Sequence, residues 1–81
     1  QKRSEWIIRR LWDAFVDPKT AISIIPGDWI HRFERDQRQE TPVWTWERMV
    51  IDYIAGMTDM YAEKIYNELY GLKVGSIYDI D

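Results

Sequence analysis

The stretch from Asp52 to Ala62 carries signals for the end of one helix and the start of another within eleven residues. Gly56 can end the first helix, because a residue without a side chain adopts the left-handed conformation at little cost. Thr58 can accept hydrogen bonds from the first N–H groups of the next helix, and Asp59 places a negative charge at the positive end of that helix. The pattern predicts two helices that meet at 56–58. The alternative is one continuous helix with an interior glycine, which would cost about 1 kcal/mol relative to alanine.

A left-handed Gly56 would make this position intolerant of side chains. On that interpretation, Gly56→Val should destabilise the fold by more than about 1 kcal/mol through backbone strain.

Helical spacing and capping signals extend this prediction to an all-α fold, a small bundle of about four helices. The helices are expected over about 5–16, 28–36, 42–55 and 58–70, followed by a C-terminal tail. Ser4, Asp28 and Thr41-Pro42 are the expected starts of the first three, and Gly71 is the expected C-cap of the last. The first helix should present one broad apolar side to the core, formed by Ile7, Ile8, Leu11, Trp12, Phe15 and Val16.

The segment between the first two helices has no obvious partner strand. Asp17-Pro18 ends the first helix, since a proline disfavours the helical conformation in the residue before it. The β-branched run at 21–25 is then interpreted as a packed connector, with room for a helical turn, rather than as a strand. Residues 72–81 are expected to form a tail that is ordered only where it docks onto something.

The aromatic content is high for a chain of this size. Five Trp, five Tyr and two Phe occur in 81 residues, whereas so short a chain buries only about 60–65% of its unfolded surface. Part of this aromatic surface should therefore face a partner subunit or the rest of a longer chain. The absence of an initial methionine points the same way, although trimming of the chain would also account for it. We expect residues 1–81 to be a single helical domain from a larger protein.

Several classes of function are disfavoured by composition. There is no cysteine for a disulfide or a thiolate metal site, and the apolar run at 21–25 is far too short to cross a membrane. The net charge is −3 and the basic residues are dispersed, which argues against a dedicated nucleic-acid-binding module. We expect a cytoplasmic protein.

Catalytic and metal-binding residues are not evident. His31 is the only histidine, so the usual imidazole ligands of a zinc or two-metal site are lacking. Asp52 and Asp59 would share a face only in an unbroken helix. Tyr53 and Tyr61 are expected in the core or an interface, with base stacking as the alternative.

Arginines are the candidates for anion contacts, although no substrate-binding residue is assigned. Guanidinium groups pair well with phosphate, and surface ion pairs are the alternative role for each of them. The residues concerned are Arg9, Arg10, Arg32, Arg35 and Arg38.

The sequence Asp-Tyr-Ile-Ala-Gly-Met-Thr-Asp at 52–59, followed by Tyr61-Ala62, resembles the C-terminal signature of bacterial deoxyguanosinetriphosphate triphosphohydrolases and related dNTPases of the HD-domain superfamily. From about Ser4 to Tyr70 the chain is similar in outline to their helical phosphohydrolase-associated region. Met60 departs from the basic residue usual in these relatives. The signature residues, taken as structural, are Asp52, Tyr53, Ile54, Gly56, Met57, Thr58, Asp59, Tyr61 and Ala62.

This resemblance implies a parent enzyme that hydrolyses a deoxynucleoside triphosphate to a deoxynucleoside and triphosphate. A divalent metal such as Mg or Mn, held by the His and Asp residues of the HD motif, would assist the attack of water. This chain has one histidine and no His-Asp pair, so we expect no cofactor in it and no activity from it alone.

The implied role is that of the C-terminal helical portion of the enzyme. It would support the HD catalytic domain of the same protein and a homo-oligomer, and the parent would bind deoxynucleoside triphosphate. The alternative is a stand-alone helical module for protein–protein interaction, binding through an aromatic face.

Overall fold

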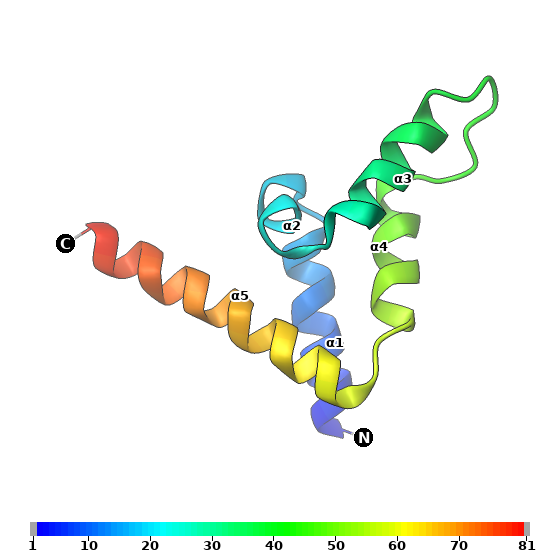
Figure 1. Cartoon of the computed structure of the whole chain (residues 1–81). Coiled ribbons are helices and arrows are strands. Elements are labelled where there is room, and N and C mark those ends of the chain that lie inside the picture. Colours follow the sequence, from blue (N-terminus) through cyan, green and yellow to red (C-terminus); the bar gives the residue numbers. More distant parts are fainter. Residues whose placement is uncertain (1, 81) are drawn as a thin grey trace.

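Five helices and no strand form the described part of the chain, which comprises the backbone of residues 2–80 and the side chains of residues 5–71 in this computed structural model (Figure 1). In chain order the helices are α1 (Lys2–Phe15), α2 (Pro18–Ile24), α3 (Gly27–Gln37), α4 (Trp46–Ala55) and α5 (Asp59–Ile80). The predicted all-α fold is confirmed. The predicted number of helices was too low, because the connector after the first helix is itself helical.

This connector, α2, is a short helix with a well-defined start and a buried side. The Asp17 carboxylate accepts a hydrogen bond from the backbone N–H of Lys19 at 3.1 Å, and Pro18 occupies the first helical turn. Ala21 and Ile25, which lie one turn apart, are both buried, whereas Ile22 is 64% exposed. The β-branched residues thus follow a helical rather than an alternating pattern.

The core forms around α1, which packs against α2, α4 and α5 (Figure 1). Its members recur at helical spacing on these elements: Ile7, Leu11, Phe15, Ala21, Ile25, Met49, Val50, Tyr53, Ile54, Ala62, Ile65 and Leu69. The indole N–H of Trp46 also donates to the carbonyl of Phe15 at 2.9 Å. This bond joins the start of α4 to the end of α1 and satisfies a carbonyl that has no partner within its own helix.

The apolar side of α1 is divided between the core and the surface. Ile7, Leu11 and Phe15 are buried, whereas Ile8 remains 37% exposed and Trp12 is half-buried. The expectation of one broad core-facing side was therefore only partly correct. The three buried residues, which are spaced four apart, are enough to fill the contact with α4 and α5. The neighbouring row, with Ile8 and Trp12, faces partly towards solvent.

Two predicted helix starts were wrong. Helix α1 begins at Lys2, so Ser4 lies within its backbone and does not cap it. Helix α3 begins at Gly27 with Pro26 as its N-cap residue, and no side chain caps it. Asp28 instead lies in the first turn, where its charge is favourable to the helix dipole.

The start of α4 was also predicted too early. The loop before it is tied to α3 by Asp36, whose carboxylate accepts hydrogen bonds from the backbone N–H groups of Val43 and Trp44. Thr45 then caps the helix, since its hydroxyl oxygen accepts from the N–H of Arg48 at 3.1 Å. Thr41 and Pro42 belong to the loop, and not to the helix.

Helix α5 is longer than predicted. It passes through Gly71 to Ile80, so Gly71 is not a C-cap, and the backbone of 72–80 is helical rather than an extended tail. Whether this part docks depends on side chains outside the described residues. Because α5 extends beyond the other helices, the radius of gyration is 13.9 Å, against roughly 12 Å for a compact domain of this length. In the described part of the chain no helix combines the length and apolar character needed to cross a bilayer.

Candidate functional site

The break between α4 and α5 is confirmed, but Gly56 does not form it in the predicted way. Gly56 has φ −85° and ψ 0°, and its N–H donates to the carbonyl of Ile54. No described residue, glycine included, has a positive φ. A Cβ built at Gly56 would lie 3.7 Å from the Asp52 carbonyl oxygen and 3.8 Å from that of Tyr53, which are ordinary contacts. The left-handed assignment was wrong.

Thr58 and Asp59 start α5 as their residue types predicted. The Thr58 hydroxyl oxygen accepts from the N–H of Tyr61 at 3.1 Å, and its carbonyl oxygen accepts from the N–H of Ala62 at 2.9 Å. Asp59 is exposed in the first turn. The second helix of the motif is therefore capped by the motif's own residues.

Tyr53 and Tyr61 connect the two helices across the break. Their hydroxyl oxygens lie 3.2 Å apart, and Tyr53 is only 4% exposed. Trp29 from α3 meets the Tyr53 ring edge-on, with centroids 5.3 Å apart. Burial, and then the hydrogen bond with Tyr61, raise the pKa of Tyr53 well above its ordinary value. Both effects favour the neutral phenol, so Tyr53 is unsuited to act as a phenolate base.

Asp52 faces a different side of α4 and is engaged within the chain. One carboxylate oxygen accepts from the Trp44 indole N–H at 2.9 Å, and the other lies 3.3 Å from Nε of Arg48. Asp52 and Asp59 are on separate helices. Among the described residues, no three His, Cys, Asp or Glu side chains converge as a metal site would require, and His31 is exposed on α3.

The other signature residues line or support the break. Ile54 and Ala62 are buried in the core, and Met57 packs against the core from the turn. A pocket of about 370 Å³ opens beside it, lined by Pro26, Trp29, Tyr53, Gly56, Met57, Thr58 and Tyr61. Its three hydroxyls, those of Tyr53, Thr58 and Tyr61, can donate and accept hydrogen bonds but provide no nucleophile paired with a base.

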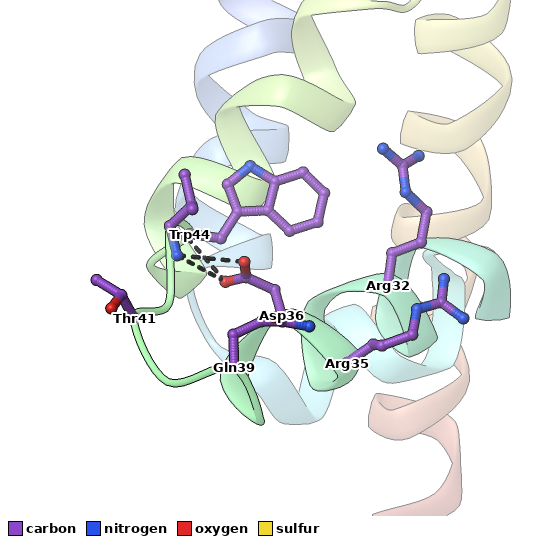
Figure 2. Close-up of a pocket in the computed structure, with 7 residues that line it drawn as sticks. Arg32, Arg35, Asp36, Gln39, Thr41 and Trp44 are labelled. Atoms are coloured by element: carbon purple, nitrogen blue, oxygen red, sulfur yellow. Dashed lines mark hydrogen bonds between the residues drawn. The ribbon is translucent and has the colours of Figure 1, made fainter.

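A second cleft, of about 520 Å³, lies between α3 and the loop before α4 (Figure 2). Arg32 and Arg35 extend from α3 on the same side, and Trp44 faces them from the loop. The Arg32 guanidinium carbon is 4.9 Å from the Trp29 ring centroid and 5.4 Å from that of Trp44. The two indoles are stacked, with centroids 6.2 Å apart.

Sequence reasoning missed the part of Asp36 and Trp44 in this cleft. Asp36 organises the loop through three contacts to the N–H groups of Val43 and Trp44, at 2.9–3.2 Å. One available signal was its position in the last turn of α3, where a negative charge is unfavourable to the helix dipole. A carboxylate in the last turn is therefore expected to accept hydrogen bonds from donors outside its own helix. Nothing local in the sequence marks Trp44.

A third surface feature is an apolar groove between α1 and α4. It has a volume of about 290 Å³ and is lined by Ile8, Trp12, Ile51, Ile54 and Ala55. Ile8 and Ile51 are 37% and 46% exposed. We call this set the α1–α4 groove.

Comparison with known proteins connects this helical arrangement to a family. The family model of the phosphohydrolase-associated domain matches residues 1–68. A deoxyguanosinetriphosphate triphosphohydrolase-like protein of Shewanella loihica is 30% identical over 79 residues, which are 96% of this chain and 17% of that protein. One of Rickettsia akari is 29% identical over 75 residues, 93% of this chain and 17% of that protein.

A shorter match is closer in sequence. The deoxyguanosinetriphosphate triphosphohydrolase-like protein 2 of Deinococcus radiodurans is 46% identical over 33 residues, 41% of this chain and 8% of that protein. No solved structure matches the chain. The chain thus spans about a sixth of the length of the Shewanella and Rickettsia proteins. With 68 of its 81 residues matched by the family model, the chain belongs to the phosphohydrolase-associated domain family.

Proposed function

We propose that this chain is the C-terminal helical portion of a deoxynucleoside triphosphate triphosphohydrolase, in which it supports the catalytic HD domain. The parent would convert a deoxynucleoside triphosphate and water into a deoxynucleoside and triphosphate. Support comes from the family match and from relatives named as deoxyguanosinetriphosphate triphosphohydrolase-like proteins. The signature at 52–62 would be structural: it sets the angle between α4 and α5 through Thr58 and the Tyr53–Tyr61 contact.

The catalytic metal of the parent does not fit the described residues of this chain. Asp52 is engaged by Trp44 and Arg48, and the described side chains offer no group of three ligands. A divalent metal such as Mg or Mn would therefore be held by the HD domain, and we assign no catalytic residue here.

The α1–α4 groove is the observation that carries the supporting role. Its five lining residues are apolar, and two isoleucines remain substantially exposed although α1 and α4 pack against each other. Covering such side chains would contribute about 1 kcal/mol each, given the transfer free energy of partly exposed apolar area. The HD domain is the proposed occupant, because most of the length of the related proteins lies outside the matched segment.

Further exposed apolar side chains lie outside this groove, including Val43 and Met60. Within the same proposal, these would contact neighbouring copies in a homo-oligomer, and the parent would act in the cytoplasm.

The proposal is tested in the parent enzyme with the double variant Ile8→Lys/Ile51→Lys. We expect a lower Tm and reduced dNTP hydrolysis with unchanged metal content, because charges would enter the docking surface. Ile22→Lys is the matched control: it makes the same change at a more exposed position on α2 and should leave both quantities unchanged.

An unaltered Tm and activity in the double variant would contradict the docking role. The stand-alone interaction module would then be favoured if the 81-residue chain unfolds cooperatively as a monomer and binds a separate protein through the same groove.

A further inference from the structure

Two of the five arginines that could contact phosphate, Arg32 and Arg35, line one cleft together (Figure 2). They lie one helical turn apart on α3, so their side chains leave the helix on the same side. Both residues are exposed. Gln39, Thr41 and Trp44 form the opposite wall of the cleft, where an amide and a hydroxyl add possible donors.

The lining of this cleft has a net positive charge, because two guanidinium groups face one carboxylate, and that carboxylate already has hydrogen-bond donors within the chain. Asp36 accepts from the N–H groups of Val43 and Trp44 and from the Gln37 amide, the last at 3.1 Å. Neither Arg32 nor Arg35 forms an ion pair with any side chain among residues 5–71. The two guanidinium groups are thus available to a ligand.

Arg9 and Arg10 differ in this respect. Arg9 lines a cleft with three carboxylates, those of Glu5, Asp13 and Asp59. Arg10 lies in a cleft with Asp13. These acidic neighbours would repel an anion and compete for the guanidinium groups, whereas the α3 cleft combines two arginines with a single carboxylate that already has donors.

Arg32 is also held in position before any ligand arrives. Its guanidinium lies over both Trp29 and Trp44, and the stacked indoles are fixed in turn by the Trp44–Asp52 hydrogen bond. A side chain immobilised in this way loses less conformational entropy on binding. Planar guanidinium groups with parallel N–H donors suit the tetrahedral oxygens and the double charge of phosphate.

We propose that the cleft of Arg32, Arg35 and Trp44 binds a phosphate group of a small ligand. Arg32 and Arg35 donate to the phosphate oxygens. The volume of about 520 Å³ leaves room for a second phosphate or for the group to which the phosphate is attached. This inference does not depend on the proposed function, since it uses only residues of this chain.

The test is a titration of the 81-residue chain with inorganic pyrophosphate, followed by NMR of the indole N–H groups and by calorimetry. The indole signals of Trp29 and Trp44 should shift, whereas that of Trp6 should not. Arg32→Gln/Arg35→Gln should weaken binding by about tenfold or more, because two charge-assisted hydrogen bonds are lost.

Arg9→Gln/Arg10→Gln is the matched control. It removes the same charge from α1, and it also includes an arginine over an indole, since Arg10 lies 4.9 Å from the Trp6 ring centroid. It should weaken pyrophosphate binding by less than about twofold, which is the effect of net charge alone. Arg32→Lys, which keeps the charge but loses the planar donors, should still weaken binding several-fold.

Equal weakening by the two glutamine pairs would overturn the proposal, and so would the absence of shifts at Trp29 and Trp44. Equal affinity for succinate would overturn the assignment to phosphate. Titration with ADP identifies the source: tighter binding than pyrophosphate supports a nucleotide as the ligand, and equal binding supports recognition of the phosphates alone.

Discussion

At the scale of single residues, the turn at Gly56 shows that a glycine at a helix end need not be there for its conformational freedom. Its φ of −85° and ψ of 0° are those of a common turn position, open to residues with a side chain. The helix ends here because Met57 N–H bonds to the Ile54 carbonyl at 3.1 Å and Thr58 begins the next cap.

Gly56→Ala should therefore leave stability nearly unchanged. We expect a change in the free energy of unfolding of less than about 1 kcal/mol, with a small gain if the loss of unfolded-state entropy dominates. Urea unfolding of the two proteins measures this. A loss well above that value would show that the position needs a left-handed residue after all, as the sequence had indicated.

Tyr53 gives stability a dependence on alkaline pH. Its folded-state pKa is raised by burial and by Tyr61, so the folded protein keeps its proton where the unfolded chain, with a pKa near 10, releases it. The contribution is thus fully present below pH 10 and is lost as the pH rises towards the folded pKa. The contribution of Tyr53 to the free energy of unfolding should fall by up to about 1.4 kcal/mol per pH unit in that range.

Tyr53→Phe provides the comparison for this effect. Urea unfolding between pH 9 and 11 should show a shallower decline for the variant than for the original chain, whereas Tyr70→Phe, at a position 60% exposed, should leave the slope unchanged. Parallel slopes for all three proteins would mean that Tyr53 ionises equally well in the folded state.

At the scale of elements, the structure places the N-cap of α4 at Thr45, whereas the sequence pattern favours Thr41. Variants at the two positions distinguish these starts. Thr45→Ala should cost about 1 kcal/mol of stability, because it removes the acceptor of the Arg48 N–H. Thr41→Ala should cost close to nothing, since Thr41 lies in the loop and caps no helix. Thermal unfolding of both variants measures the difference. A larger loss of stability for Thr41→Ala would show that α4 begins at Thr41.

At this scale, a feature could be predicted when the residues that form it are close together in the sequence. The break and the Thr58 cap were predicted because their partners lie within three residues. The start of α4 was not, since Asp36 fixes the loop from seven and eight residues away. Gly71 does not end α5, because an interior glycine costs only about 1 kcal/mol and does not by itself end a helix.

The candidate sites follow the same division. The signature at 52–62 could be identified from the sequence alone, because its residues are consecutive. The cleft of Arg32, Arg35 and Trp44 could not, because it joins one face of α3 to a loop whose path is set by hydrogen bonds to Asp36. Arginine at helical spacing indicated a candidate, but only the folded arrangement distinguishes Arg32 and Arg35 from Arg9 and Arg10.

At the scale of the whole molecule, the helices leave surfaces of opposite character. The α1–α4 groove is apolar, and the cleft beside α3 is cationic and polar. The described chain measures 45 × 35 × 17 Å, so it is thin in one direction and much of its side-chain surface lies close to the outside. Such a shape would suit the proposed contact with other protein.

The α1–α4 groove should accordingly contribute little to the stability of the isolated chain. In the isolated 81-residue protein, Ile8→Lys/Ile51→Lys should change the free energy of unfolding by less than about 1 kcal/mol, because both side chains already contact solvent and the lysine stems can cover the same surface. Leu11→Ala, at a position with 0% exposure on the same helix, should cost about 2–5 kcal/mol. Sedimentation should also show less self-association for the lysine variant, because an exposed apolar surface is removed. A loss comparable to that of Leu11→Ala would place the groove residues in the core of this chain, and would leave no free apolar surface there for an HD domain to cover.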